Sequence, residues 1–338
     1  MRVRVGINGM GRVGRAVLRG IAERADCGVE VVGVNDLAPI PTLAHLLRYD
    51  STYGRWAALI EDDAEHLSVD GHLVRAFAEP DPAALDWQAL GVDVVVEATG
   101  RFRTRGQAAV HLARGARKVV LTSPGQGLDA TIVMGLNEDT YSAPEHHVIS
   151  NASCTTNCAA PMIAVLHRAF GIQHGLLTTV HSYTGDQNLQ DGPHKDLRRA
   201  RAAAVNLIPT STGAARAIAE IMPELAGRLD GIAVRVPVAD GSLVDLTVQL
   251  AEEATVGQVN RAFAVAAEGR LKGFLRYTTD PIVSSDVLGD PASCVFDAGL
   301  TTVTGNLAKV FGWYDNEWGY AQRTIDLVDM VARTLPDR

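Results

Sequence analysis

The sequence predicts an α/β protein of two domains: a doubly wound parallel sheet domain, followed by an α+β domain with a mixed or antiparallel sheet. Its 338 residues suffice for two domains of ~100–200 residues each. Strands and helices alternate over the first 150 residues, whereas strand-like runs follow one another with longer polar connections afterwards. The first pattern is typical of βαβ units, and the second of an α+β architecture.

Short β-branched runs separated by amphipathic stretches predict the first domain. Runs such as Val92–Val96 are almost entirely apolar, as expected of strands buried on both faces of a parallel sheet. The expected strands are Val3–Asn8, Glu30–Asn35, Val92–Glu97, Lys118–Thr122 and Thr131–Gly135, and the expected helices include Arg12–Arg24 and Arg105–Gly115.

The domain boundary is placed after residue 152, so that residues 1–152 form the first domain and 153–317 the second. A C-terminal helix of about residues 318–338 is expected to pack back on the first domain. The stretch Asp186–Arg201 is polar, basic and without a clear period, which predicts a functional loop. The second domain's expected strands include Gly175–His181, Ile232–Pro237 and Ser242–Leu250.

Composition argues against several classes of protein. A net charge of −8 gives no support to binding of nucleic acid or of a membrane surface. Four cysteines are too few for a secreted disulfide framework. The N-terminal residues run into a strand pattern without a signal peptide, and no apolar run approaches the ~18–20 residues of a membrane span. We therefore expect a cytoplasmic protein with neither nucleic-acid nor membrane partners.

A glycine-rich turn follows the first strand and opens the first helix. It matches the Gly-x-Gly-x-x-Gly fingerprint of Rossmann-type domains, in which Gly9 permits a tight turn, Gly11 lets a pyrophosphate approach and Gly14 packs helix on strand. Asp36 ends the next strand, near the ~20-residue spacing of a ribose-binding acid. Because a carboxylate there repels a 2′-phosphate, NAD is expected rather than NADP. Alternatively, the glycines mark only a tight turn.

Cys154 lies in a Ser/Asn-rich segment just before a helical stretch, Ala159–Phe170. Such a segment predicts a helix N-cap, and a thiol at a helix N-terminus has its thiolate stabilised by the helix dipole. The alternatives are an inert core cysteine, as expected for Cys27 and Cys294, or a disulfide or metal pair with Cys158. A zinc site needs a second closely spaced Cys/His pair, and since none is evident, no metal is expected.

Further motifs accompany this cysteine along the chain. They are Gly6–Arg15 (GINGMGRVGR), Tyr49–Gly54 (YDSTYG), Thr178–Thr184 (TTVHSYT), Pro193–Arg201 (PHKDLRRAR), Pro209–Ala215 (PTSTGAA) and Trp313–Tyr320 (WYDNEWGY). With Ser150–Cys158 (SNASCTTNC), they make the chain resemble the phosphorylating glyceraldehyde-3-phosphate dehydrogenases of bacterial type over essentially its whole length.

This resemblance implies a reaction and its two catalytic residues. Cys154 would be the nucleophile and His181 its acid–base partner. The family oxidises D-glyceraldehyde 3-phosphate to 1,3-bisphosphoglycerate while reducing NAD, in glycolysis and gluconeogenesis, through a cysteine thiohemiacetal and a thioester. The resemblance also implies a homotetramer.

The resemblance further implies three groups of binding residues. Thr184, Asp186, Arg199 and Arg235 would surround the phosphate of the substrate, and Ser153, Thr155, Thr212 and Gly213 the attacking inorganic phosphate. The remaining expected cofactor contacts, beyond the glycine fingerprint and Asp36, are Arg12, Val13, Thr122 and Asn316.

Three other functions are carried as alternatives. An erythrose-4-phosphate dehydrogenase would use the same scaffold, but the intact Ser211–Ala215 and Pro193–Asp196 motifs argue against it, since a strong inorganic-phosphate site fits acyl-phosphate formation. Pro80 stands where the family usually has a basic residue beside the adenine, and with other variations it suggests a second, inhibitor-resistant isoform. A non-enzymatic binding or surface protein would be favoured by loss of Cys154 or His181, and both are present.

Overall fold

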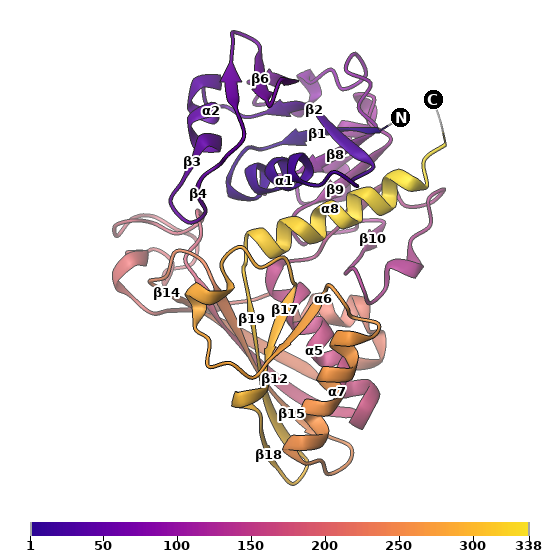
Figure 1. The fold of residues 1–338 in the computed structure, drawn as a ribbon, viewed down its shortest axis with the longest axis vertical. Coiled ribbons are helices and arrows are strands. Elements are labelled where there is room, and N and C mark those ends of the chain that lie inside the picture. The colour runs from indigo at the N-terminus through magenta and orange to yellow at the C-terminus, as the bar shows by residue number, and fades with distance from the viewer. Residues whose placement is uncertain (1, 337–338) are drawn as a thin grey trace. The chain divides into compact units, whose positions relative to one another are not determined.

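In the computed structural model, which describes residues 2–336, the chain forms two compact units (Figure 1). Unit 1 comprises the residues up to Ile132, the segment Asn137–Ala152 and the residues from Ala321 onward. Unit 2 comprises Val133–Leu136 and Ser153–Tyr320. Within residues 2–336, no helix combines the length and the apolar character that crossing a membrane requires.

Unit 1 is built on a nine-stranded sheet of order β10-β11-β9-β8-β1-β2-β7-β6-β5. The pairings from β10 to β7 are parallel, as predicted, but the edge strands β6 and β5 pair antiparallel, which the sequence analysis did not predict. The strands are β1 (Val3–Asn8), β2 (Val29–Asn35), β5 (Ile60–Asp62), β6 (His66–Val69), β7 (His72–Phe77), β8 (Val94–Glu97), β9 (Lys118–Leu121), β10 (Ala130–Thr131) and β11 (Val148–Ser150).

Two predicted elements of unit 1 are shorter than expected. The helix expected over Arg105–Gly115 forms as α3 (Arg105–Ala108) and α4 (Val110–Ala113), because the Leu112 N–H bonds the carbonyl of Ala109, three residues back, and tightens the turn. The strand expected over Thr131–Gly135 stops at Thr131, since the chain turns where the Leu136 N–H meets the Val133 carbonyl.

Helices and a small hairpin complete unit 1. α8 packs on α1 at Gly20, where an added Cβ would lie 2.5 Å from Ile325 and 2.8 Å from Gln322. Arg24 of the α1 segment pairs with Asp326 at 2.6 Å. α8 ends at Arg333, short of the expected end at 338. The elements are α1 (Arg12–Glu23), α2 (Ile40–Arg48), β3 (Tyr49–Asp50), β4 (Gly54–Arg55), the 3₁₀ turns η1 (Pro82–Ala84) and η2 (Glu138–Thr140), and α8 (Trp318–Arg333), which belongs to unit 1 from Ala321 onward.

Unit 2 is built on a mixed sheet of order β13-β14-β12-β15-β19-β17-β16, with β18 pairing β19. β12 and β14 are parallel, as are β16 and β17, and the other pairings are antiparallel. The predicted mixed sheet is therefore confirmed. Its strands are β12 (Ile172–Ser182), β13 (Ile208–Ser211), β14 (Leu229–Val236), β15 (Ser242–Leu250), β16 (Leu275–Thr278), β17 (Cys294–Asp297), β18 (Thr302–Thr304) and β19 (Leu307–Tyr314).

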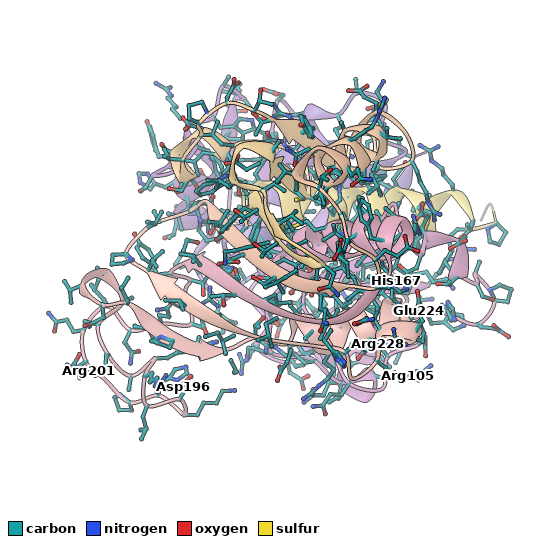
Figure 2. All side chains as sticks on the ribbon, turned by 90° about the horizontal axis from the view of Figure 1, so that it is seen from below. Arg105, His167, Asp196, Arg201, Glu224 and Arg228 are labelled. Atoms are coloured by element: carbon teal, nitrogen blue, oxygen red, sulfur yellow. The ribbon has the colours of Figure 1, made fainter. Side chains whose placement is uncertain are left out.

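Three helices pack against this sheet: α5 (Cys154–Phe170), α6 (Ala214–Ile221) and α7 (Val256–Glu268) (Figure 1). The rings of Phe263 on α7 and Phe296 on β17 stack at 3.7 Å in the core between them. Residues 183–202, which include the predicted loop Asp186–Arg201, form only turns and bends. Asp196 and Arg201 mark this loop in Figure 2, where it extends beyond the strands.

The parallel strands of unit 1 bring the predicted cofactor residues to one sheet edge. Gly9 follows β1, Asp36 follows β2, and Thr122 follows β9. The carboxyl ends of neighbouring parallel strands lie at the same edge, where α/β proteins bind their ligands. The turns after these strands therefore form the ligand-facing rim of unit 1.

Candidate active site

Cys154 is the first residue of α5, which begins five residues earlier than the sequence analysis expected. The Ser153 side chain caps the helix by accepting a hydrogen bond from the Thr156 N–H at 3.1 Å. Just before it, Ala152 has a left-handed φ of 54°, a conformation that is unusual for a residue with a side chain. The thiol thus lies at the positive end of a helix of 17 residues.

His181 reaches the thiol from the neighbouring strand. Its Nε2 lies 3.4 Å from Cys154 Sγ, near the carboxyl end of β12, and the histidine is 4% exposed. Nδ1 lies 2.7 Å from the Ser182 carbonyl oxygen. The pair predicted from the sequence motifs is therefore in contact.

Arg235 lies on the other side of this histidine. In the parallel pairing of β12 with β14, His181 is directly opposite Arg235, whose Nη1 is 2.5 Å from His181 Nδ1 and 3.0 Å from the Ser182 carbonyl oxygen. Burial, and then the Arg235 charge, lower the pKa of His181 to about 3. Burial raises the pKa of Cys154, although Arg235 opposes the shift. Both shifts favour a neutral thiol beside a neutral imidazole.

The residues expected around the substrate phosphate are brought together. Asp186 accepts hydrogen bonds from Thr184 Oγ1 and from Arg199 Nη1. Burial raises the pKa of Asp186, but the Thr184 hydrogen bond and the charges of Arg235 and Arg199 outweigh it and lower the pKa overall. Arg199 Nε also donates to Thr210 Oγ1 at 2.9 Å. Two guanidinium groups therefore converge on one carboxylate, and an incoming phosphate could take over these donors.

The residues expected at the second anion site lie at the starts of α5 and α6, two helices that pack against each other. Thr212 and Gly213 immediately precede α6, with Gly213 as its N-cap, so the first N–H groups of α6 point outward there. Thr212 Oγ1 accepts from the Ala214 N–H at 3.2 Å. Ser153 and Thr155 stand at the start of α5, but the Thr155 hydroxyl is 2.9 Å from Tyr314 Oη, so this side chain is already engaged.

In unit 1, Gly9 and Gly11 of the glycine fingerprint line a cleft. A Cβ at Gly9, where φ is +99°, would lie 2.7 Å from the Thr99 nitrogen, and one at Gly14 would collide with the Gly9 carbonyl oxygen. A Cβ at Gly11 would meet no atom within 4 Å. Two glycines thus close the turn, and the third leaves open space beside the N-terminus of α1, where a pyrophosphate fits.

The other cofactor residues contribute in different ways. Arg12 and Val13 begin α1, so their backbone N–H groups lie at its positive end, while the Arg12 side chain pairs with Asp50 at 2.5 Å. Asp36 lines the cleft and accepts the N–H groups of Met10 at 2.8 Å and Ala38 at 2.9 Å. A carboxylate has about four acceptor positions, so Asp36 retains capacity for ribose hydroxyls.

Thr122 and Asn316, both expected near the nicotinamide, belong to different units. In unit 1, Thr122 Oγ1 donates to the Glu97 carbonyl oxygen at 3.3 Å. In unit 2, Asn316 Oδ1 accepts hydrogen bonds from Ser182 Oγ at 2.9 Å and from Ser242 Oγ at 2.6 Å. Because Asn316 Oδ1 accepts both hydrogen bonds, the orientation of the amide is fixed, and its NH₂ group is left as a donor.

Comparisons with known proteins match both the N-terminal and the C-terminal part of the chain to one family. Residues 3–105 match the family model described as the glyceraldehyde 3-phosphate dehydrogenase NAD binding domain, and residues 153–316 match the C-terminal domain of the same family. The chain is 53% identical over 335 residues to glyceraldehyde-3-phosphate dehydrogenase 2 of Streptomyces arenae, covering 99% of this chain and 100% of that protein. The chain belongs to the glyceraldehyde-3-phosphate dehydrogenase family.

Other relatives support the same assignment. Identity is 54% to the glyceraldehyde-3-phosphate dehydrogenases of Streptomyces coelicolor and of Mycobacterium tuberculosis, with 99% of this chain and 100% of each relative covered. NAD is the cofactor named for the family's N-terminal domain, so the predictions of an NAD-dependent dehydrogenase and of its cofactor are confirmed. Glyceraldehyde-3-phosphate dehydrogenases 1 and 2 of S. arenae are equally similar to this chain, at 53% each, which gives the second-isoform hypothesis no support.

The sequence analysis missed Tyr314, which links the catalytic pair to the helix start. Tyr314 Oη lies 2.9 Å from both Thr155 Oγ1 and Thr179 Oγ1, and its ring packs edge-on against His181 at 5.9 Å. The residue stands in the Trp313–Tyr320 motif, so the family resemblance could have drawn attention to it. Its contacts could not be predicted, because Thr155 is far away in sequence.

A buried polar network beneath the unit 1 cleft was also missed. The Glu97 carboxylate, 2% exposed, accepts from Asn8 Nδ2 at 2.7 Å, from the Thr99 N–H at 2.9 Å and from His111 Nε2 at 3.1 Å. Trp87 Nε1 donates to His111 Nδ1 at 3.0 Å, which leaves the His111 proton on Nε2. Asn8 and Thr99 both line the cleft, so Glu97 holds its floor in place.

Replacing Glu97 with Gln is expected to raise the KM for NAD roughly 3–10-fold and to change kcat by less than about twofold, because an amide leaves donors of the buried network unpaired beside the cleft. Steady-state kinetics with varied NAD test this. Glu65→Gln, which changes an exposed glutamate in the same unit, is the control. An unchanged KM together with a lowered melting temperature would assign Glu97 a purely structural role.

Replacing Arg235 with Leu is expected to slow alkylation of Cys154 by iodoacetamide about 3–10-fold near neutral pH. Arg235 opposes the burial-driven rise in the pKa of Cys154, so its loss raises that pKa further and lowers the thiolate fraction. The pKa of His181 should rise in the same variant, because the guanidinium depresses it. Rates of alkylation from pH 6 to 9 measure the first effect, with Arg201→Leu as an exposed control. An unchanged profile would contradict the assignment.

Proposed function

We propose that the chain catalyses the oxidation and phosphorylation of D-glyceraldehyde 3-phosphate to 1,3-bisphosphoglycerate with reduction of NAD, and that Cys154 is the nucleophile. The observation that carries this proposal is the 3.4 Å contact of Cys154 Sγ with His181 Nε2 at a helix N-terminus. We also propose that residues 1–152 with the C-terminal helix form the NAD-binding domain and residues 153–317 the catalytic domain. The family membership supports both statements.

The first step is attack of the Cys154 sulfur on the aldehyde carbon. His181 Nε2 takes the thiol proton as the carbon–sulfur bond forms. Negative charge develops on the carbonyl oxygen, where the Cys154 N–H and the protonated imidazole can both donate hydrogen bonds. The proton then passes to this oxygen, and the product is a neutral thiohemiacetal on Cys154.

His181 next removes the hydroxyl proton of the thiohemiacetal, which drives hydride departure from the same carbon and leaves a thioester on Cys154. NAD, when bound, supplies the hydride acceptor. Gly9, Gly11, Gly14, Arg12, Val13 and Asp36 would hold it in unit 1, and Thr122 and the oriented amide of Asn316 would contact the nicotinamide.

In the last step, inorganic phosphate attacks the thioester. Ser153, Thr155, Thr212 and Gly213 would hold this phosphate, and the helix starts supply N–H donors there. Thr184, Asp186, Arg199 and Arg235 would bind the phosphate that the substrate itself carries, because two arginines can clasp a dianion and fix the distance from it to the reacting carbon. His181 returns its proton to the Cys154 sulfur as the acyl phosphate leaves.

The chain is further proposed to act as a homotetramer. Six large apolar side chains between the start of β12 and the end of β14 are at least half exposed, as is typical of surfaces that bind another subunit. Leu176 and Ile232 lie on adjacent strands, and the others belong to the loop and the segment that follow β12. The six are Leu176, Leu189, Leu197, Val205, Leu207 and Ile232. A cytoplasmic location is proposed as well, because a free catalytic thiol requires a reducing compartment.

The proposed reaction predicts NADH formation from NAD and glyceraldehyde 3-phosphate that requires inorganic phosphate for sustained turnover. Cys154→Ser should lower kcat by roughly 10³-fold or more, since it removes the covalent route. Cys27→Ser changes a buried cysteine of unit 1 and should retain activity. Faster, phosphate-independent oxidation of erythrose 4-phosphate would instead identify the sister activity, and no turnover of either aldehyde would favour a binding protein.

The proposed assembly predicts that Leu197→Asp combined with Leu207→Asp lowers the mass measured by native mass spectrometry from four chains to fewer, because charges would be buried without partners. Leu73→Asp is the matched control, since Leu73 is similarly exposed but lies in unit 1. An unchanged tetramer in the double variant would place the interface elsewhere, and a monomeric wild type would refute the assembly.

A further inference from the structure

Three of the four cysteines form a cluster in unit 2. Cys154 and Cys158 lie one turn apart on α5, so their side chains project from the same face of the helix. Cys294 begins β17, and its thiol lies with that of Cys158 beside Gly312. All four cysteines are free, and Cys27 belongs to unit 1.

Accessibility differs sharply within the cluster. Cys154 is partly exposed, whereas Cys158 and Cys294 are both 0% exposed. A small oxidant arriving from solvent therefore meets Cys154 first. The proposed catalytic chemistry has no use for the two buried thiols.

Gly312 on β19 lies beside the buried pair. A Cβ at this position would be 2.6 Å from both Cys294 Sγ and Met162 Sδ and 3.2 Å from Cys158 Sγ, so the two thiols and the Met162 thioether converge on the space that a side chain would occupy. The Cys158 thiol also approaches the Gly312 carbonyl oxygen at 3.5 Å. The absence of a side chain at Gly312 thus brings the two thiols to one small space, which they share with the Met162 thioether.

We propose that Cys158 and Cys294 form a buried dithiol that resolves peroxide-oxidised Cys154 and returns it to the thiol. The proposal rests on the assignment of Cys154 as the reactive thiol. It adds a second chemistry, consumption of a peroxide, and a modification site at Cys158 and Cys294.

The steps balance with a peroxide as the oxidant. The Cys154 sulfur attacks hydrogen peroxide, which gives a sulfenic acid and water. The Cys158 sulfur attacks the sulfenic sulfur, forms a Cys154–Cys158 disulfide and releases a second water. The Cys294 sulfur then attacks Cys158 Sγ, the bond to Cys154 breaks, and Cys154 leaves as the thiol. One peroxide is reduced to two waters, and two thiols are oxidised to one disulfide.

Geometry favours this order. Cα atoms four residues apart in a helix are separated by about 6 Å, inside the range that disulfides span. That bond must still adapt to a helical turn, and strained disulfides are the more readily exchanged. The final Cys158–Cys294 bond joins two sulfurs that both lie beside Gly312. Burial raises the pKa of Cys158 well above its usual value, so its attack on the sulfenic acid of Cys154 should be slow. The amount of peroxide must therefore be small, because an excess would oxidise the sulfenic acid further before Cys158 attacks it.

The test treats the full-length protein with about one equivalent of hydrogen peroxide, blocks free thiols with N-ethylmaleimide and maps the cysteines by mass spectrometry. The expected product is a Cys158–Cys294 disulfide with Cys154 alkylated. Wild-type dehydrogenase activity should recover over time to more than about half without added reductant. Cys158→Ala and Cys294→Ala should keep basal activity yet recover roughly fivefold less, and Cys27→Ala should behave as wild type.

Two outcomes would overturn the proposal. One is wild-type protein that accumulates sulfinic acid at Cys154 while Cys158 and Cys294 remain alkylatable. The other is a product that stops at the Cys154–Cys158 disulfide. Peptide mapping of the wild type decides between these results even if a core variant fails to fold. Failure of the proposed dehydrogenase function is recorded separately, as absent NADH formation before any peroxide is added.

Discussion

The parallel pairing of β12 with β14 places His181 beside Arg235, and the chemistry of unit 2 depends on this one contact. In a parallel pair, directly opposed residues project from the same face of the sheet, so the strand register alone brings an imidazole and a guanidinium together. The start of α5 then supplies the thiol on the imidazole's other nitrogen. A shift of β14 by one residue would turn Arg235 to the opposite face and leave the histidine without its neighbour.

Two positively charged side chains, Arg199 and Arg235, lie near the carboxylate of Asp186. Arg235 and Arg199 repel each other, and Asp186 offsets this repulsion by accepting a hydrogen bond from Arg199 and attracting Arg235. A phosphate brings more charge and more acceptor oxygens than a carboxylate does, so ligand binding strengthens an arrangement that already exists. The pKa of His181 is lowered by burial and then by these guanidinium groups, and the pKa of Asp186 is lowered by the Thr184 hydrogen bond and then by the same two groups.

Local sequence patterns predicted most helices and strands, but they could not predict side-chain contacts between residues that are distant in the sequence. The bounds of β1 and β15 were predicted to the residue, because alternating or continuous β-branched runs end at polar turns. The start of α5 was misplaced, since Thr155, Thr156 and Asn157 have weak intrinsic helix propensity and form helix here only because the Ser153 cap and core packing stabilise it. The Glu97–His111 pair and the hydroxyl of Tyr314 could not be predicted, because side chains distant in sequence meet only in the folded core.

The position of α8 has a consequence for how the chain is made. Unit 1 is completed by the last helix of the sequence, whose Ile325 and Gln322 cover Gly20 of α1, and whose Asp326 and Asp329 bond Arg24 and the Gly28 N–H. A growing chain emerges from the ribosome with its N-terminus first. The N-terminal unit therefore waits, with one flank of α1 bare, until the whole of unit 2 has been synthesised. A chain that ends anywhere before residue 321 lacks the helix that covers α1, so it exposes apolar surface in its N-terminal unit. Chaperones and proteases that recognise exposed apolar surface can then bind it.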